Sequence, residues 1–220
     1  VPEALVESVL LLLAGLILAG IVGRALLGIL IAYVLLQLAY TFALKQKMIV
    51  DVMCIALGFV FRAVAGAAAI GVEPSPWLII CTFTLCLFIG FCKRCNEIAS
   101  LTGNGEAWQH RNTLAGYTDS LLTHLITLSG AIAVVAFLIY AASAHTVKNL
   151  GTNFLLYTLP FVIYGVCRFA MISMQGRYSD PTEIIVRDRP LQWTGLLWTA
   201  SVIAIIRWGV AARQWLHTQF

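Results

Sequence analysis

Seven mostly apolar runs constrain this chain more than any other feature of its sequence. Each run is long enough to cross, as a helix, a hydrocarbon core about 30 Å thick. Strands of a membrane barrel would instead alternate apolar and polar residues over about ten positions, and these runs do not alternate. We therefore predict seven membrane-spanning helices, at residues 5–22, 25–43, 52–71, 77–92, 120–141, 152–172 and 191–212.

The composition supports an integral membrane protein. The chain of 220 residues is 60% hydrophobic and 11% charged, with a mean hydropathy of +0.90, and a soluble domain of this size does not need so much apolar surface. We predict an all-α, polytopic membrane bundle that forms a single transmembrane domain over residues 1–220. The net charge of +4 comes from few acidic residues rather than many basic ones, so it does not indicate nucleic-acid binding.

The cysteines and histidines do not indicate a metal site. Most of the six cysteines lie inside apolar runs, where cysteine behaves as a small hydrophobic residue. Cys92 and Cys95 form a C-x-x-C pair, but neither a second pair nor a histidine cluster accompanies it. The sequence also lacks the common hydrolase, zinc-protease and phosphate-loop motifs.

The distribution of Lys and Arg predicts the orientation in the membrane. The segments 44–51, 93–119 and 173–190 fall on one side of a seven-span chain and hold eight Lys and Arg residues, whereas the other side holds three. Cytoplasmic loops carry the excess of Lys and Arg, so we place these three segments in the cytoplasm. The same rule makes any such face basic, and basicity alone is therefore weak evidence for a site.

Arg62 lies near the middle of the predicted span 52–71 and is costly there. It is about 16 Å beyond Asp51 at about 1.5 Å per residue, which is near the bilayer midplane. A guanidinium at that depth costs at least about 3 kcal/mol unless it faces water, an anion or a carboxylate. One hypothesis is a structural salt bridge to another helix. The other is a cavity that opens near Lys45, Lys47 and Asp51, descends to Arg62 and admits anions.

The predicted cytoplasmic segments contain further charged groups. Lys93, Arg94 and Glu97 lie at the end of one span, and Glu183 and Arg187 have the i,i+4 spacing of an amphipathic surface helix. Thr118 or Asp119 is suited to cap the helix that follows. Membrane anchors, caps and surface ion pairs explain each group separately. Their concentration on the face that contains the entrance towards Arg62 favours an anion-binding site.

The order of these groups resembles the UbiA-type prenyltransferase superfamily, and within it the decaprenyl-phosphate phosphoribosyltransferase branch. Aromatic prenyltransferases carry a second Asp-rich motif after the helix that ends near Phe91, and this chain has Lys93-Arg94-Cys95-Asn96-Glu97 there. The matching groups are Leu44-Lys45 with Asp51-Val52; Gly58-Phe59 with Arg62-Ala63 and Ala65-Gly66; Lys93-Arg94 with Glu97; Arg111 with Leu114 and Tyr117; Pro160-Phe161 with Arg168-Phe169; and Pro181, Glu183-Ile184, Arg187-Asp188-Arg189 with Leu191-Gln192.

The resemblance implies a nine-helix fold, of which about seven helices are present. The expectation is a fragment that lacks two upstream helices and, with them, an Asn/Asp-rich magnesium motif. The implied cofactor is therefore Mg²⁺, with ligands upstream of residue 1 and none in this chain. The implied location is the bacterial inner membrane, with the active face in the cytoplasm.

The resemblance also implies the reaction and the roles of residues. Phosphoribosyl pyrophosphate would be the donor and a polyprenyl phosphate the acceptor. The protein would contact the lipid bilayer and would not bind nucleic acid, and a homo-oligomer is left open. Each implied role belongs to a set of residues. Donor binding falls to Lys45, Arg62 and Asp51; lipid-phosphate binding to Lys93, Arg189, Arg94, Arg168 and Arg187; and orientation of these groups to Glu97, Asp188 and Tyr117.

Two other functions remain open from the sequence. The same fold could transfer a prenyl group from a prenyl pyrophosphate to an aromatic or other acceptor, although the absent second Asp-rich motif argues against this. A non-enzymatic transporter or scaffold for an anionic lipid is the other alternative. Broken helices in corresponding halves would favour it, and the sequence contains no such pair.

Overall fold

The computed structural model describes the backbone of residues 2–104, 117–176, 178 and 180–219, and the side chains of 6–99, 117–176, 178 and 180–209. Its regular elements within these ranges are all helices. The chain divides into two compact units, Val1–Pro74 and Ser75–Phe220, and each is described by itself. The prediction of one domain for residues 1–220 stays a prediction.

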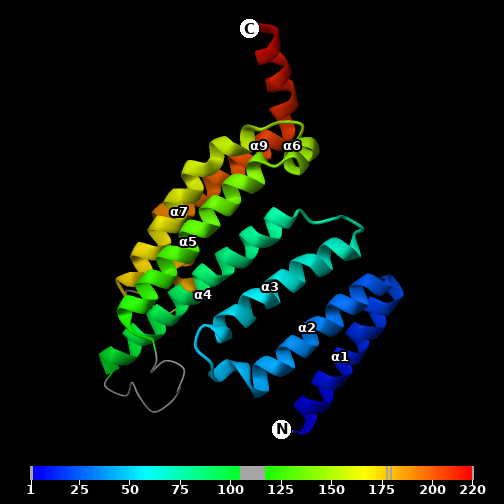
Figure 1. Ribbon diagram of the computed structural model, residues 1–220, viewed down its shortest axis with the longest axis vertical. Coiled ribbons are helices and arrows are strands. Elements are labelled where there is room, and N and C mark those ends of the chain that lie inside the picture. Colours follow the sequence, from blue (N-terminus) through cyan, green and yellow to red (C-terminus); the bar gives the residue numbers. More distant parts are fainter. Residues whose placement is uncertain (1, 105–116, 177, 179, 220) are drawn as a thin grey trace. The chain divides into compact units, whose positions relative to one another are not determined.

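The first unit consists of three long helices joined by short turns (Figure 1). Helix α1 (Pro2–Val22) packs on α2 (Arg24–Phe42), and α2 packs on α3 (Val50–Ala69). A short 3₁₀ helix, η1 (Leu44–Gln46), joins α2 to α3. Gly58 of α3 faces α2, because a Cβ atom at Gly58 would lie 3.6 Å from Cε2 of Tyr33. The Tyr33 ring therefore packs beside α3 at the level of Gly58, at ordinary van der Waals distance.

The turn into α3 is strained. Ile49 has φ 64° and ψ −46°, and the Val50 N–H donates to the Met48 carbonyl at 2.6 Å. This hydrogen bond and these angles define a classic γ-turn, which is rare. A β-branched residue at positive φ is unfavourable by about 1–3 kcal/mol, so the surrounding structure must hold Ile49 in place.

The second unit is a bundle built on four longer helices (Figure 1). Helix α4 (Pro76–Asn104) packs along α5 (Asp119–Ala142), α5 along α7 (Leu159–Met174) and α7 along α9 (Arg189–Gln219). Three short helices connect them: α6 (Ala144–Leu150), η3 (Phe154–Thr158) and α8 (Pro181–Arg187).

Gly130 lies at a close approach of three helices within this bundle. A Cβ atom on Gly130 of α5 would lie 3.1 Å from the Phe88 ring of α4 and 3.2 Å from Val166 of α7. The Phe88 ring in turn packs on Phe169 of α7, with ring centroids 5.8 Å apart. The small residue therefore allows α4, α5 and α7 to converge at one level, as in many membrane bundles.

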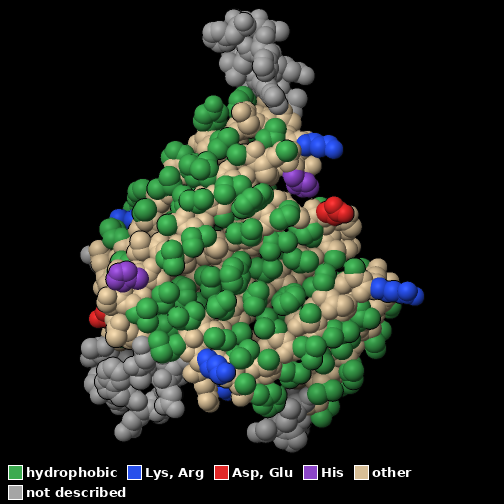
Figure 2. Space-filling model, viewed as in Figure 1, with side chains coloured by type: hydrophobic (Ala, Val, Ile, Leu, Met, Phe, Trp, Pro, Cys, Tyr) green, Lys and Arg blue, Asp and Glu red, His purple; other side chains and the backbone are tan. Residues whose placement is uncertain are grey.

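The fold prediction is confirmed: the protein is a polytopic helical membrane protein. The predicted spans fall on helices, with 152–172 covering η3 and α7, and five helical segments of the described chain are long and apolar enough to cross a membrane. Helix α9, which contains the predicted span 191–212, is not one of these five. The segment Val6–Val22 of α1 is shorter. Hydrophobic side chains cover most of the face seen in Figure 2, and large ones such as Leu11 and Ile21 are exposed, as lipid-facing residues are.

One predicted boundary was wrong. We expected the span 77–92 to end in a polar loop at Lys93, but α4 continues without interruption to Asn104. Lys, Arg, Asn, Glu, Ile and Ala follow there, and most of these residues are compatible with a helix, so the change to polar residues marks the membrane surface rather than the helix end. The expected surface helix around Glu183 is present as α8.

Candidate functional site

Arg62 is held by aromatic residues in the first unit. Its Nη2 donates a hydrogen bond of 2.7 Å to the Tyr33 hydroxyl of α2. Its guanidinium carbon lies 5.4 Å from the centroid of the Tyr33 ring and 5.2 Å from that of the Phe59 ring, within the range of cation–π contacts. In the described ranges of the chain Arg62 forms no ion pair and its side chain is exposed. The hypothesis of a structural salt bridge to another helix therefore finds no carboxylate among these residues.

Tyr33 and Gln37, which the sequence prediction did not include, form a hydrogen-bonded chain with Arg62. Gln37 lies one turn after Tyr33 on α2, and its Nε2 donates to the Tyr33 hydroxyl at 3.2 Å. The two are the i,i+4 polar pair of an otherwise apolar stretch, and that pattern was the available signal.

The other predicted donor residues lie at the start of α3. Asp51 is completely buried in the first turn of α3, where the partial positive charge of the helix favours a carboxylate. Lys45 is exposed in η1. Arg62 is eleven residues beyond Asp51, but helical side chains tilt towards the N-terminus, so Arg62 leans towards the Asp51 end.

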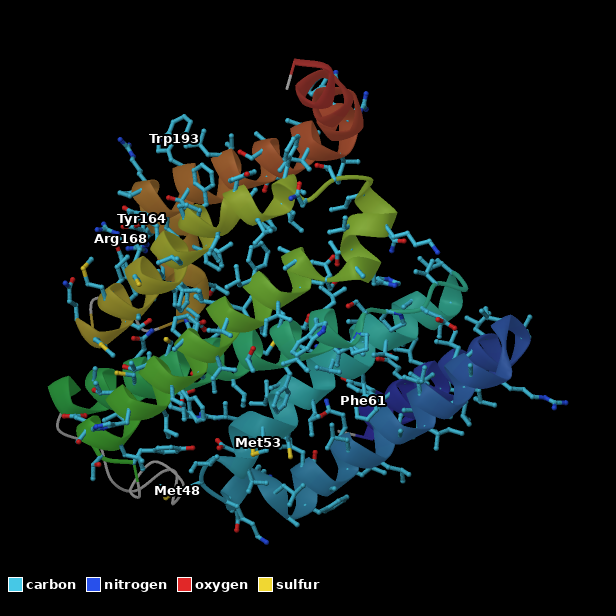
Figure 3. The ribbon with its side chains drawn as sticks, turned by 45° about the horizontal axis from the view of Figure 1, so that its top comes forward. Met48, Met53, Phe61, Tyr164, Arg168 and Trp193 are labelled. Atoms are coloured by element: carbon cyan, nitrogen blue, oxygen red, sulfur yellow. The ribbon has the colours of Figure 1, made fainter. Side chains whose placement is uncertain are left out.

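In the second unit, Arg168 and Asp188 form a bidentate ion pair. The Arg168 Nη2 and Nε atoms lie 2.9 and 3.2 Å from the two oxygens of the Asp188 carboxylate. Figure 3 shows Arg168 one turn from Tyr164 on α7, with Trp193 on α9. Asp188 also accepts the Leu191 N–H at 2.9 Å and so caps α9. The hydrogen bonds from Arg168 hold the pKa of Asp188 below its ordinary value, although burial of the carboxyl acts the other way.

The remaining predicted groups divide into paired and unpaired cations. Arg94 is buried and donates to the Glu97 carboxylate. Arg187 and Glu183 form the predicted i,i+4 pair, with Arg187 Nη2 3.9 Å from Glu183 Oε1. Lys93 and Arg189 are exposed, and neither has an ion-pair partner among the described residues.

The last predicted groups precede α5. Tyr117 is buried just before this helix, and Thr118 caps it by accepting the Leu121 N–H at 3.3 Å. Arg111 and Leu114 lie outside the described residues.

The described carboxylates do not fit a magnesium ion. Mg²⁺ prefers several hard oxygen ligands in octahedral geometry. No group of three or more His, Cys, Asp or Glu residues comes together in the described part of the chain. Glu97 and Asp188 are already paired with arginines.

Comparison with known proteins gives several relatives that carry the same name. Two decaprenyl-phosphate phosphoribosyltransferases are each 30% identical to this chain. The one from Mycolicibacterium smegmatis aligns over 94% of this chain and 67% of its own length. The one from Mycobacterium tuberculosis aligns over 95% and 68%.

A more distant relative carries the same name, from Corynebacterium glutamicum, at 28% identity over 84% of this chain and 55% of its own. No family model matches the sequence. The resemblance carried by Arg62, Lys93 and the residues around Asp188 is thereby confirmed. The chain belongs to the decaprenyl-phosphate phosphoribosyltransferases, a family of transferase enzymes.

Proposed function

We propose that this protein transfers the phosphoribosyl group of phosphoribosyl pyrophosphate to a polyprenyl phosphate, at the cytoplasmic face of a bacterial inner membrane. One observation carries the proposal beyond the names of the relatives. Three cations from the matching motifs, Arg62, Lys93 and Arg189, are exposed and have no carboxylate partner in the described part of the chain. Unneutralised cations of this kind suit phosphate and pyrophosphate groups.

The reaction needs cations more than it needs a base. An oxygen of the polyprenyl phosphate, already anionic, attacks the anomeric carbon of the ribose. The bond from that carbon to the pyrophosphate oxygen breaks, and pyrophosphate leaves with the electron pair. Catalysis then consists of positioning the two substrates and stabilising the charge on the leaving group.

The residues divide between the two substrates. Lys45 and Arg62, with Asp51, bind the phosphoribosyl donor. Lys93 and Arg189, helped by Arg187, bind the lipid phosphate. Arg168 and Arg94 are engaged by Asp188 and Glu97. The Arg168–Asp188 pair contributes by holding the end of α7 against the start of α9, whereas the Arg94–Glu97 pair lies within α4.

The test is release of pyrophosphate by the full-length protein in membranes, with Arg62→Ala as the variant. We expect the variant to accumulate in the membrane normally and the KM for the donor to rise at least about tenfold, since hydrogen bonds to charged groups contribute about 1.5–3 kcal/mol. Arg24→Ala, another exposed arginine of the same unit, is the matched control and retains the normal KM.

Two outcomes would contradict the proposal. Pyrophosphate release from a prenyl pyrophosphate and an aromatic acceptor, but not from the phosphoribosyl donor, would establish the prenyltransferase alternative. If pyrophosphate is released from neither donor and polyprenyl phosphate still binds, the alternative of a non-enzymatic transporter or scaffold for an anionic lipid would be established.

A further inference from the structure

The hydrogen bonds of the Tyr33 hydroxyl leave its proton without an acceptor. A hydroxyl oxygen has two lone pairs and one hydrogen. The lone pairs accept from Arg62 Nη2 at 2.7 Å and from Gln37 Nε2 at 3.2 Å. In the part of the chain that the structure describes, no hydrogen bond donated by Tyr33 is found. Arg62 makes one hydrogen bond there, so most of its five N–H groups are also available.

These free donors lie deep in the predicted membrane region. Tyr33 is near the middle of α2 and Arg62 is past the middle of α3, and both helices are long and apolar enough to cross a membrane. Lipid tails supply no acceptors, and an unsatisfied polar group costs several kcal/mol there. A cluster with surplus donors and one positive charge is complementary to an anionic oxygen.

Two aromatic rings and one hydrogen bond keep Arg62 in place. The Tyr33 ring lies beside Gly58 of α3, and its hydroxyl accepts a hydrogen bond from Arg62. The Phe59 ring centroid lies 5.2 Å from the guanidinium carbon. Arg62 is therefore oriented before any ligand arrives, which lowers the entropy lost on binding.

We propose that Tyr33 is a binding residue of the donor site, whose hydroxyl both orients Arg62 and donates its proton to a phosphoryl oxygen of the phosphoribosyl donor. This inference rests on the proposed function. The hydroxyl holds one guanidinium N–H away from the ligand and directs the others towards it, so Tyr33 and Arg62 act as one unit.

The experiment compares Tyr33→Phe with the wild-type full-length protein in membranes. Phenylalanine keeps the ring that contacts Arg62 and removes only the hydroxyl. We expect the KM for the phosphoribosyl donor to rise about tenfold, because the variant loses a charge-assisted hydrogen bond to a phosphoryl oxygen. We expect kcat and the KM for polyprenyl phosphate to change less than about twofold. Tyr157→Phe, an exposed tyrosine of the second unit, is the matched control.

A double-mutant cycle tests whether Tyr33 acts with Arg62. Residues that act as a unit are non-additive, so Tyr33→Phe should raise the donor KM less in an Arg62→Ala background than in the wild type, because only the direct hydrogen bond from the hydroxyl is left to lose. An unchanged donor KM in Tyr33→Phe, with normal wild-type turnover, would overturn the inference and leave the proposed function standing. A fall in kcat or in membrane-inserted protein with an unchanged donor KM would make the contact purely structural. A raised KM for polyprenyl phosphate alone would move the cluster to the acceptor site.

If the wild-type protein releases no pyrophosphate from the phosphoribosyl donor, the proposed function fails separately. Binding of inorganic pyrophosphate to the same two proteins then decides the inference on Tyr33. Equal affinities of Tyr33→Phe and wild type would overturn it, and weaker binding by the variant would support it.

Discussion

Asn96 is a buried polar residue in a costly position. Its side chain is 1% exposed, and neither its Oδ1 nor its Nδ2 has a hydrogen-bond partner in the described residues. Cys92 and Ala99 lie on the same side of α4 and contact the end of α7, at Ser173 and Gly176 respectively. Asn96, between them on that side, therefore faces the last turn of α7. A buried amide without partners lowers stability by the cost of its lost hydration.

Replacing Asn96 with leucine, which has the same branched shape although it is larger, should raise the free energy of unfolding by about 1–3 kcal/mol, because the desolvation cost of the amide disappears. Thermal unfolding of the purified protein in detergent measures the change. Asn96→Asp is the control and should lower the midpoint, since it buries a charge in the same place. A lower midpoint in Asn96→Leu would mean that the amide does have a stabilising partner.

A candidate site residue can be predicted from the sequence where a charged side chain interrupts an apolar run. Arg62 is found in this way. Tyr33 and Gln37 carried a weaker signal, because tyrosine is common in membrane helices. The partner of Arg62 and the isolation of Asn96 depend on which sides of the helices meet, and the local pattern does not specify that.

Among the elements, the joint between α8 and α9 depends on one carboxylate. Asp188 ends α8, caps α9 through the Leu191 N–H and pairs with Arg168 of α7. The pair spans twenty residues of sequence, so no helical spacing predicts it, whereas the spacing of Glu183 and Arg187 does predict their contact. Arg189 follows Asp188 directly in the sequence, so the position of Arg189 depends on this joint.

The joint should be sensitive to acid. The pKa of Asp188 is lowered in the folded protein, so its ionised form contributes stability fully above the unfolded-state pKa, near 3.8, and this contribution is lost as pH falls through the lower folded value. We expect Asp188→Asn to lower the thermal midpoint at pH 6. The difference in midpoint between this variant and the wild type should become smaller as pH falls towards 3. Midpoints measured in detergent from pH 3 to 7 test this. A difference independent of pH would show that capping of α9, not the ionised carboxylate, determines the effect.

Helix positions were more predictable than helix ends. Apolar length located five of the predicted spans on helical segments of the described chain that are long and apolar enough to cross a bilayer. The end of α4 was missed since hydropathy reports where the membrane ends, and helices continue beyond it. The closeness of α4, α5 and α7 at Gly130 likewise depends on packing across helices that are distant in sequence.

At the scale of the whole molecule, the orientation in the membrane remains a prediction. Lys47, before α3, and Ile185, in α8, belong to the predicted cytoplasmic face, whereas His145, in α6, belongs to the other. Single cysteines at these positions in a cysteine-free protein should react with an impermeant reagent from the cytoplasmic side at 47 and 185, and from the opposite side at 145. Labelling of 145 and 185 from the same side would contradict the seven-span topology. A cysteine at position 106, in the predicted cytoplasmic segment 93–119, should also react from the cytoplasmic side, and this position lies outside the described residues.

The length of α4 has a consequence for how a lipid would reach the protein. Its 29 residues extend about 44 Å at about 1.5 Å each, well beyond a hydrocarbon core of about 30 Å. If Pro76 lies at the far surface, Lys93 stands about 26 Å along the helix, near the level where headgroups begin. A phosphate could meet Lys93 while its isoprenoid tail stays among the acyl chains. The protein and such a lipid would then meet by lateral diffusion in the plane of the membrane. The frequency of these encounters would depend on the mole fraction of the lipid in the membrane, not on its concentration in the cell volume.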